Sequence, residues 1–217
     1  MGRELRIVDT EAIYHVVARG NNKGPIVWDR YDCETFTDEL GAVATKYKWE
    51  VFTWSLMPNH HHVVLRAPQD GLSAGFQELN GNHSRRTNRR HDRMDHLFRN
   101  RFRWTPVLSD AHLIGTVLYV ARNPLTAGLC AHAREWQYGS YRAIAGHEPA
   151  PRWLVVDQVL RLFGPTPEQA RLEFERLVHG GHLLVSDTKG NAGAADTPSL
   201  RSDQVEHLVA LLLHQGF

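Results

Sequence analysis

Residues 54–65 read WSLMPNHHHVVL and contain the turn between two strand-like runs. The runs on either side, WEVFTWSLM (49–57) and HHHVVLRA (60–67), are rich in the β-branched and aromatic residues that strands favour. Only Pro58 and Asn59 separate them, and a connection this short joins antiparallel strands. The sequence therefore predicts an antiparallel β-hairpin in the first half of the chain.

Further strand and helix patterns flank this hairpin on both sides. AIYHVVAR (12–19) predicts a strand that ends at a Gly-Asn-Asn turn, and Asp29 can cap the helix that follows. Helices are expected over 30–47 and over 73–90, and the second is expected to be broken or kinked at Gly81. A strand is expected over 97–108, interrupted near Arg99 and Asn100. A last helix is expected over 111–122, and it should stop near Asn123 because Pro124 follows. Their order, βαββαβα, predicts an α+β fold: a ferredoxin-like or RRM-like antiparallel sheet with helices on one face.

The composition shifts after Gly146, where the Pro-rich stretch HEPAPRW begins. We expect a first domain over 1–147 and a helical C-terminal extension over 148–217. The extension is expected to hold helices over 155–163, from Pro167 onward and over 202–215. Residues 186–199, SDTKGNAGAADTPS, are small and polar and predict a flexible segment.

Length and composition exclude several classes of protein. The chain has 217 residues, 42% of them hydrophobic and 23% charged, which is the ordinary range for a globular protein with its own core. Cys33 and Cys130 are too few for a disulfide framework or a cysteine-ligated zinc cluster. No apolar run of membrane-spanning length and no secretory segment is present, so we expect a cytoplasmic protein without a membrane partner.

Positive charge is concentrated in one segment, although the whole chain carries a net charge of only +1. Residues 83–103 hold eight arginines and two aspartates, a local net charge of +6, with Phe98 and Phe102 among them and Trp104 directly after them. Arginine pairs with phosphate oxygens and aromatic rings stack on bases, so this mixture favours single-stranded nucleic acid as a partner. A solvated helix face, with Phe98 and Phe102 in the core, is the structural alternative.

Two pairs of residues are candidates for chemistry. Side chains alternate along a strand, so His60 and His62 point to the same face and can converge on one divalent metal. Tyr119 and Asn123 stand four apart on a helix and therefore share a face, where a phenol nucleophile and an amide oxygen ligand could act together. Each pair also has a structural alternative. With 14 histidines in the chain, a His-x-His pattern can arise by chance, and Tyr119 can be a packing residue with Asn123 at the end of the helix.

The combined motifs resemble those of the REP-associated tyrosine transposases, a branch of the single-tyrosine HUH nuclease superfamily. The motifs are YHVVARGNN (14–22), WSLMPNHHHVVL (54–65), HLFRNRFRW (96–104), YVARNPLTAGL (119–129) and EWQYGSYRAIAG (135–146). They occur in the family's order and cover about residues 12–146. The resemblance implies a transposase-like enzyme that cleaves and rejoins single-stranded DNA beside a hairpin, with Mg²⁺ or Mn²⁺, through a covalent 5′-phosphotyrosine.

The resemblance also assigns roles to individual residues. His60 and His62 match the metal-binding histidines, Tyr119 matches the nucleophile, and Asn123 falls where the family places its third metal ligand. The expected DNA contacts are Arg19, Asn21 and Asn22, which match a stretch near the recognised DNA, and the arginines Arg85, Arg86, Arg89, Arg99, Arg101 and Arg103. The chain departs from the family at His61, where a hydrophobic residue is usual, and at Thr126, where an arginine is usual. The resemblance is compatible with a monomer or a homodimer.

Two other functions are compatible with the same residues. A non-catalytic protein of RRM-like fold would bind nucleic-acid hairpins through its sheet and would need neither Tyr119 nor the paired histidines. A metal-dependent hydrolase that uses water would need the histidines and not Tyr119. Replacing Tyr119 with Phe separates these readings from the transposase-like one.

Overall fold

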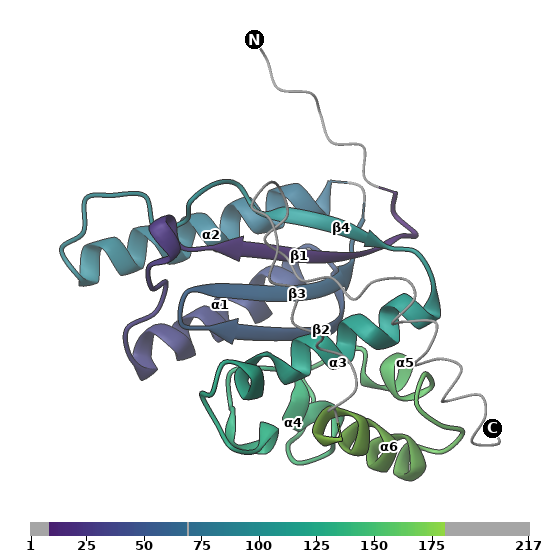
Figure 1. Ribbon diagram of the computed structural model, residues 1–217. Helices are drawn as coiled ribbons and strands as arrows, with labels where there is room; N and C mark the ends of the chain where they lie inside the picture. Colours follow the sequence, from purple (N-terminus) through teal and green to yellow (C-terminus); the bar gives the residue numbers. More distant parts are fainter. Residues whose placement is uncertain (1–8, 69, 181–217) are drawn as a thin grey trace, which may run out of the picture.

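The computed structural model describes residues 9–68 and 70–180, which form a four-stranded antiparallel sheet with helices around it (Figure 1). The strands are β1 (Ile13–Arg19), β2 (Glu50–Met57), β3 (His60–Arg66) and β4 (Arg103–Val107), and their order across the sheet is β2-β3-β1-β4. β2 and β3 form the predicted hairpin, with Leu56 opposite His61 across a turn of two residues. This strand order is that of a ferredoxin-like sheet, and the predicted α+β fold class is confirmed.

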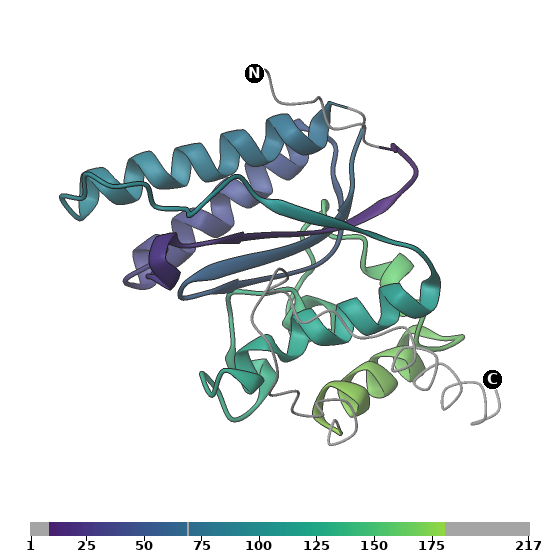
Figure 2. The same cartoon turned by 45° about the horizontal axis from the view of Figure 1, so that its top comes forward.

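The helices cover both faces of the sheet, whereas the sequence led us to expect them on one. α1 (Arg30–Lys46) and α2 (Gly71–Arg90) pack together over one face, and α3 (Asp110–Thr126) lies across the other (Figure 2). The physical reason lies in β3, where the five residues from His61 to Leu65 are all buried. Because successive side chains point to opposite faces, a strand buried throughout needs cover on both sides.

Two predicted helix interruptions are wrong. α2 runs without a break through Gly81, because one glycine lowers helix stability without ending a helix that packs along its length on α1. α3 continues past Pro124 to Thr126. The proline lies in the last turn and is buried, and the helix end is closed by hydrogen bonds from the Ala127 amide to the Asn123 carbonyl and from the Leu129 amide to the Pro124 carbonyl.

The segment before β4 is joined to the end of β1. The predicted strand over 97–108 is shorter in the structure: regular pairing begins at Arg103, after the predicted interruption near Arg99 and Asn100, and Phe98 forms an isolated bridge with Gly20. Upstream, the Asn21 amide donates to the Leu97 carbonyl and the Arg99 amide donates to the Arg19 carbonyl. These bonds hold the arginine-rich segment against the loop after β1, which contains the short 3₁₀ helix η1 (Asn21–Lys23).

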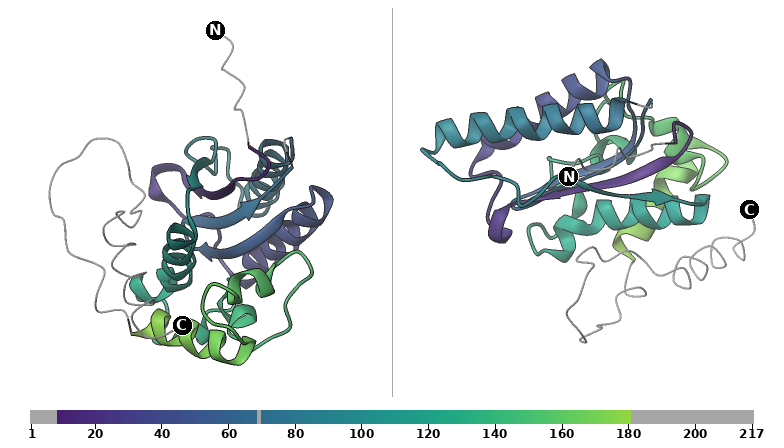
Figure 3. Two further views of the ribbon diagram at one scale, coloured as in Figure 1. Left: turned by 90° about the vertical axis from the view of Figure 1, so that its right-hand side faces the viewer. Right: turned by 90° about the horizontal axis from the view of Figure 1, so that it is seen from above.

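The chain after α3 packs on the sheet edge and on α3 itself. It contains η2 (Ala133–Glu135), α4 (Tyr141–Ile144), α5 (Val156–Leu160) and α6 (Pro167–His179), which begins at the predicted Pro167. The segment around Leu154 bridges β2 at Val51, and α6 contacts α3 on the side away from the sheet (Figure 3). Thr166 caps the N-terminus of α6. Phe174 and Val178 of α6 are buried in the same hydrophobic core as the apolar residues of the sheet.

The expected domain boundary near residue 147 stays a prediction. The helix expected over 155–163 is shorter and spans Val156–Leu160. The predicted flexible segment at 186–199 and the predicted helix over 202–215 lie outside the described residues. Within the described ranges, no helix combines the length and the apolar character that crossing a bilayer requires.

Candidate active site

The three histidines of β3 alternate between the two faces of the sheet. His61 is completely buried on the side of α1 and α2, where it packs against Phe36 with 5.0 Å between ring centroids. Its Nε2 forms a 2.9 Å hydrogen bond with the Asn80 side-chain oxygen. His60 and His62 therefore face α3, as the period of two predicts, and their ring centroids are 4.8 Å apart.

The side-chain amide of Asn59 orients His60. Asn59 Nδ2 donates to the Lys23 carbonyl at 3.1 Å, so the amide oxygen is the atom that faces His60. That oxygen lies 2.7 Å from His60 Nδ1 and can only accept, so His60 carries its proton on Nδ1. Nε2 of His60 is then left with a lone pair. Burial, helped by the positive charge of Arg19, lowers the pKa of His60 to about 4.

His62 is the most enclosed residue of the site, with 2% of its surface exposed. A 2.9 Å hydrogen bond joins its Nδ1 to Nε2 of His15 on β1, and the two rings are stacked. Its Nε2 is buried without a hydrogen-bond partner among the described residues. Burial is the largest cause that lowers the pKa of His62 well below its usual value, so this imidazole is neutral.

Tyr119 extends from α3 toward this histidine. Its ring meets His62 edge-on with 5.5 Å between centroids, and it lies 6.1 Å from the ring of His15. Burial raises the pKa of Tyr119, while a side-chain hydrogen bond with Asn123 and the positive charge of Arg19 act in the opposite direction. Asn123 Nδ2 also donates to the Tyr119 carbonyl at 3.0 Å. The helix therefore presents the phenol and the amide together, as their spacing of four predicts.

These residues fit a divalent cation. Two neutral imidazoles face one side of the sheet, and the unpartnered, buried Nε2 of His62 is the kind of atom that a metal takes as a ligand. Asn123 brings an amide oxygen to the same face through α3. No group of three or more His, Cys, Asp and Glu side chains placed to hold a metal occurs in the described part of the chain, so a site here needs the amide as its third donor.

Some of the predicted DNA-contacting residues surround this site. Arg19 lies directly opposite His60 in the β1–β3 pairing, and Arg103 lies opposite Val17 on the same face as His62. Asn21 and Asn22 form η1 just beyond Arg19, where Asn22 adopts a left-handed conformation with φ of 51°. Arg99 is exposed and is joined to Arg19 through the backbone. Arg101, which lies between Arg99 and Arg103 in the sequence, is also exposed.

The other predicted DNA-contacting arginines lie on α2, across the sheet from Tyr119. Arg86 forms a 2.9 Å ion pair with Glu39 of α1, which ties the two helices together. Arg85 hydrogen-bonds Asn82 of its own helix, and Arg89 is exposed. Phe102 is 6% exposed and packs on Phe76, so the core reading of this aromatic is correct. The arginines therefore form two separate groups rather than one surface.

Sequence reasoning did not single out His15 or Asn59. His15 alternates with Val17 and Arg19 on β1, so the period of two places it on the site face, yet only the strand pairing brings it to His62. Asn59 reads as an ordinary turn residue after Pro58. No local sequence pattern indicates that the Asn59 side chain orients His60, the next residue in the chain.

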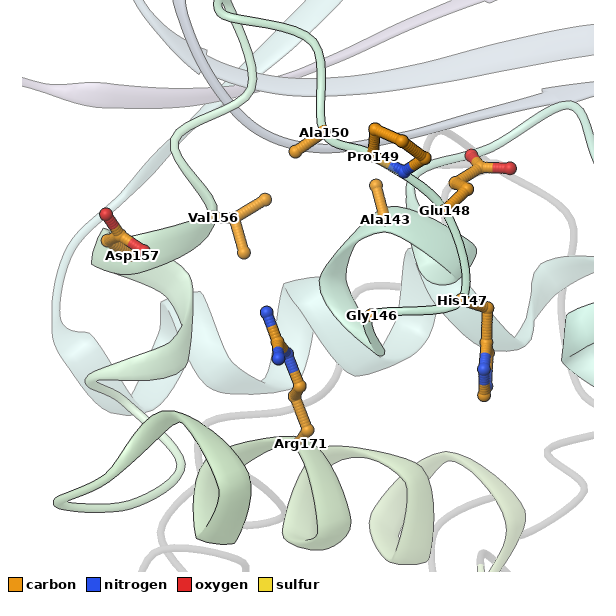
Figure 4. Close-up of a pocket in the computed structure, with 9 residues that line it drawn as sticks. All are labelled: Ala143, Gly146, His147, Glu148, Pro149, Ala150, Val156, Asp157 and Arg171. Carbon is orange, nitrogen blue, oxygen red and sulfur yellow. The ribbon is translucent and has the colours of Figure 1, made fainter.

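A separate hollow of about 520 Å³ lies between α4, α5 and α6, and Arg171 points into it (Figure 4). Its lining residues all come from the stretch 143–171 and include none of the residues described above. Arg171, Glu148 and Asp157 give this hollow a mixed charge. It is therefore distinct from the face that holds the histidines.

Comparison with known proteins finds one matching family model and a similar fold. Residues 9–111 match the family model described as Transposase IS200 like, a match that includes His60 and His62 and ends before Tyr119. The structure of a REP-associated tyrosine transposase bound to a REP hairpin is similar over 70% of this chain and 89% of that chain, with 16% identity and a TM-score of 0.55. A candidate transposase of Deinococcus radiodurans matches with 18% identity over 52% of this chain and 89% of its own, with a TM-score of 0.38. No curated protein matches the sequence.

Proposed function

From the match of residues 9–111 to the model of the IS200-like transposase family, we propose that the chain is a metal-dependent endonuclease and strand transferase for single-stranded DNA. It cuts beside a DNA hairpin and keeps the cut end on Tyr119 as a covalent 5′-phosphotyrosine. The observation that carries this proposal is the contact of the Tyr119 ring with His62, because His62 and its neighbour His60 are the two side chains proposed to bind the metal.

The proposed reaction exchanges one phosphate ester for another. The hydroxyl oxygen of Tyr119 forms a bond to the phosphorus of the scissile phosphodiester while the bond from phosphorus to the 3′ oxygen breaks. The phenol loses its proton and the 3′ oxygen gains one, so the products are a 3′-hydroxyl strand and a 5′-phosphotyrosine. Rejoining is the reverse reaction with another 3′-hydroxyl, and one tyrosine holds one covalent end at a time.

His60, His62 and Asn123 would hold the Mg²⁺ or Mn²⁺ that the family resemblance implies. When bound there, the cation would polarise the scissile phosphate and neutralise charge on its oxygens. The protein itself contributes a phenol that burial keeps protonated and that the hydrogen bond with Asn123 orients. Arg19, opposite His60, adds a positive charge that favours the ionised phenol and pairs with phosphate.

The substrate we propose is single-stranded DNA next to a hairpin, bound by both arginine groups. Arg19, Arg99, Arg101 and Arg103, with Asn21 and Asn22, lie on the side of the site and would hold the strand that is cut. Arg85 and Arg89 on α2 are exposed and would reach phosphates farther along the DNA. Because Tyr119 and His62 come from one chain, a monomer carries a complete site, and a homodimer is not required.

A hairpin-binding protein without catalysis is the second candidate, and the raised pKa of Tyr119 is the observation that favours it. One experiment separates the two: incubation of the protein with a panel of single-stranded hairpin oligonucleotides and Mn²⁺ or Mg²⁺, followed by a denaturing gel. A slower-migrating protein–DNA adduct that disappears in Tyr119→Phe supports the proposed enzyme. Binding without any cleavage supports the binder, and cleavage that survives Tyr119→Phe supports a hydrolase that uses water.

A further inference from the structure

The two histidines of the site are held in the same manner, each through the Nδ1 atom of its ring. Nδ1 of His60 lies 2.7 Å from the Asn59 side-chain oxygen, and Nδ1 of His62 lies 2.9 Å from Nε2 of His15. Neither Asn59 nor His15 belongs to the proposed ligand set. In both cases the hydrogen bond leaves Nε2 as the ring atom that faces away from the partner.

The direction of the Asn59 bond follows from its second contact. Because Asn59 Nδ2 is engaged by the Lys23 carbonyl, its oxygen faces His60 and can only accept a proton. Asn59 is itself fixed by the hydrogen bond from the Gly20 amide to its backbone carbonyl at 2.8 Å. His60 is therefore locked with its proton on Nδ1 by a group that is anchored to the loop after β1.

The His15 bond has two arrangements, and the surroundings of His62 distinguish them. Two ring nitrogens 2.9 Å apart are joined by one proton, which here lies between Nε2 of His15 and Nδ1 of His62. If His15 held that proton, His62 would carry its own on Nε2, where no acceptor is available among the described residues. If His62 holds it, Nε2 has a bare lone pair, which is what a metal ligand needs.

We propose that His15 and Asn59 are positioning residues that keep His62 and His60 in the Nδ1–H form, so that both Nε2 lone pairs point to one cation. This inference rests on the proposed function. Without its partner each ring would divide between two tautomers, and the form with a proton on Nε2 cannot bind a metal through that atom. Partners of this kind change metal affinity by about 10-fold to 100-fold in other metal sites.

The tautomers can be read directly in the full-length protein without metal or DNA. Long-range ¹H–¹⁵N NMR of ¹⁵N-histidine protein separates the Nδ1–H from the Nε2–H form, and we expect His60 and His62 both to show Nδ1–H. Electron paramagnetic resonance of free Mn²⁺ then gives the affinity for the metal alone. His15→Phe removes the acceptor, whereas His15→Gln places an amide oxygen where Nε2 of His15 stands.

We expect His15→Phe to weaken Mn²⁺ binding by about 10-fold or more and to move His62 toward the Nε2–H form. His15→Gln should restore both readouts, which a purely structural role would not do. His112→Gln is the matched control, because His112 is close enough to influence His15 and is not among the hydrogen-bond or ring partners of His62 in the described part of the chain. An Nε2–H form of His62 in the unaltered protein would overturn the inference, as would unchanged Mn²⁺ affinity and tautomer in His15→Phe. Either result leaves the proposed function standing if the Tyr119 adduct still forms.

Discussion

The ring of Tyr119 stands edge-on to the ring of His62, with an interplanar angle of 88° and 5.5 Å between centroids. Tyr119 lies on α3 and His62 on β3, and the contact forms because α3 covers the sheet face toward which His62 points. The four proposed site residues, His60, His62, Tyr119 and Asn123, are thereby provided by one chain. The burial of the paired histidines keeps them neutral, and a neutral imidazole is the form that binds a metal.

Tyr119→Phe should abolish the covalent protein–DNA adduct while leaving the fold and hairpin binding intact. The phenylalanine keeps the edge-on packing on His62 and removes only the oxygen that bonds to phosphorus. Removal of a nucleophile of this kind lowers turnover by at least about 10³-fold in other enzymes. The measurement is a denaturing gel with a labelled hairpin oligonucleotide, and Tyr31→Phe, an exposed tyrosine, is the control. Adduct formation by Tyr119→Phe would refute the assignment of the nucleophile.

Chelation of divalent metal should stop adduct formation, and added Mn²⁺ should restore it. His62→Ala removes the buried imidazole whose Nε2 lacks a partner, so we expect it to lose Mn²⁺ binding and the adduct together. His96→Ala, at an exposed histidine in the loop before β4, should retain both. Full activity in a chelator, or undiminished Mn²⁺ binding by His62→Ala, would show that this face does not hold the metal.

The two arginine groups should respond differently to substitution. Arg99→Ala combined with Arg103→Ala should weaken binding of a single-stranded oligonucleotide and lower the slope of log affinity against log salt by about 0.7 for each phosphate that the protein no longer neutralises. Arg86→Ala should instead lower stability, by about 1–3 kcal/mol, because it leaves the mostly buried Glu39 without its ion-pair partner. Binding titrations at several salt concentrations and urea unfolding distinguish these effects. A salt slope that Arg86→Ala changes as strongly would show that Arg86 contacts DNA rather than only tying α2 to α1.

His83 should make the protein lose stability as the pH falls below about 6.5. Burial lowers the pKa of His83 in the folded protein, while its Nε2 donates to the Ile26 carbonyl at 2.7 Å. As the pH falls below about 6.5, the His83 imidazole is protonated in the unfolded chain before it is protonated in the folded protein. The free energy of unfolding therefore decreases below that pH. His83→Gln keeps a donor and should reduce the slope of unfolding free energy against pH by up to about 1.4 kcal/mol per pH unit. Urea unfolding between pH 5 and 8 measures this slope, and an unchanged slope would contradict the prediction.

Much of the architecture follows from local patterns, because strand alternation and turn residues act over short distances. The run HHHVVL predicted both the hairpin and the shared face of His60 and His62, and both are present in the structure. The side on which α3 packs did not follow, since it depends on the burial of β3 from both faces. The contact of His15 with His62 depends on the pairing of β1 with β3, which no local pattern specifies. The extension of α3 through Pro124 reflects tertiary packing that overrides a helix-ending signal.

Gly20→Ala should disturb the loop that joins Arg19 to the histidine site. A Cβ atom at Gly20 would lie 2.1 Å from the Gly24 carbonyl oxygen, a backbone atom that cannot move without shifting η1. The Gly20 amide also donates to the Asn59 carbonyl, so a shift of this loop reaches the side chain that orients His60. We therefore expect Gly20→Ala to weaken both Mn²⁺ binding and hairpin binding, besides lowering the melting temperature. Gly81→Ala is the matched control, because its nearest neighbour is the flexible end of Arg85 at 3.3 Å and the helix should gain about 0.5–1 kcal/mol. If Gly20→Ala lowered stability alone, with metal and DNA affinities unchanged, the loop would be a structural turn uncoupled from the site.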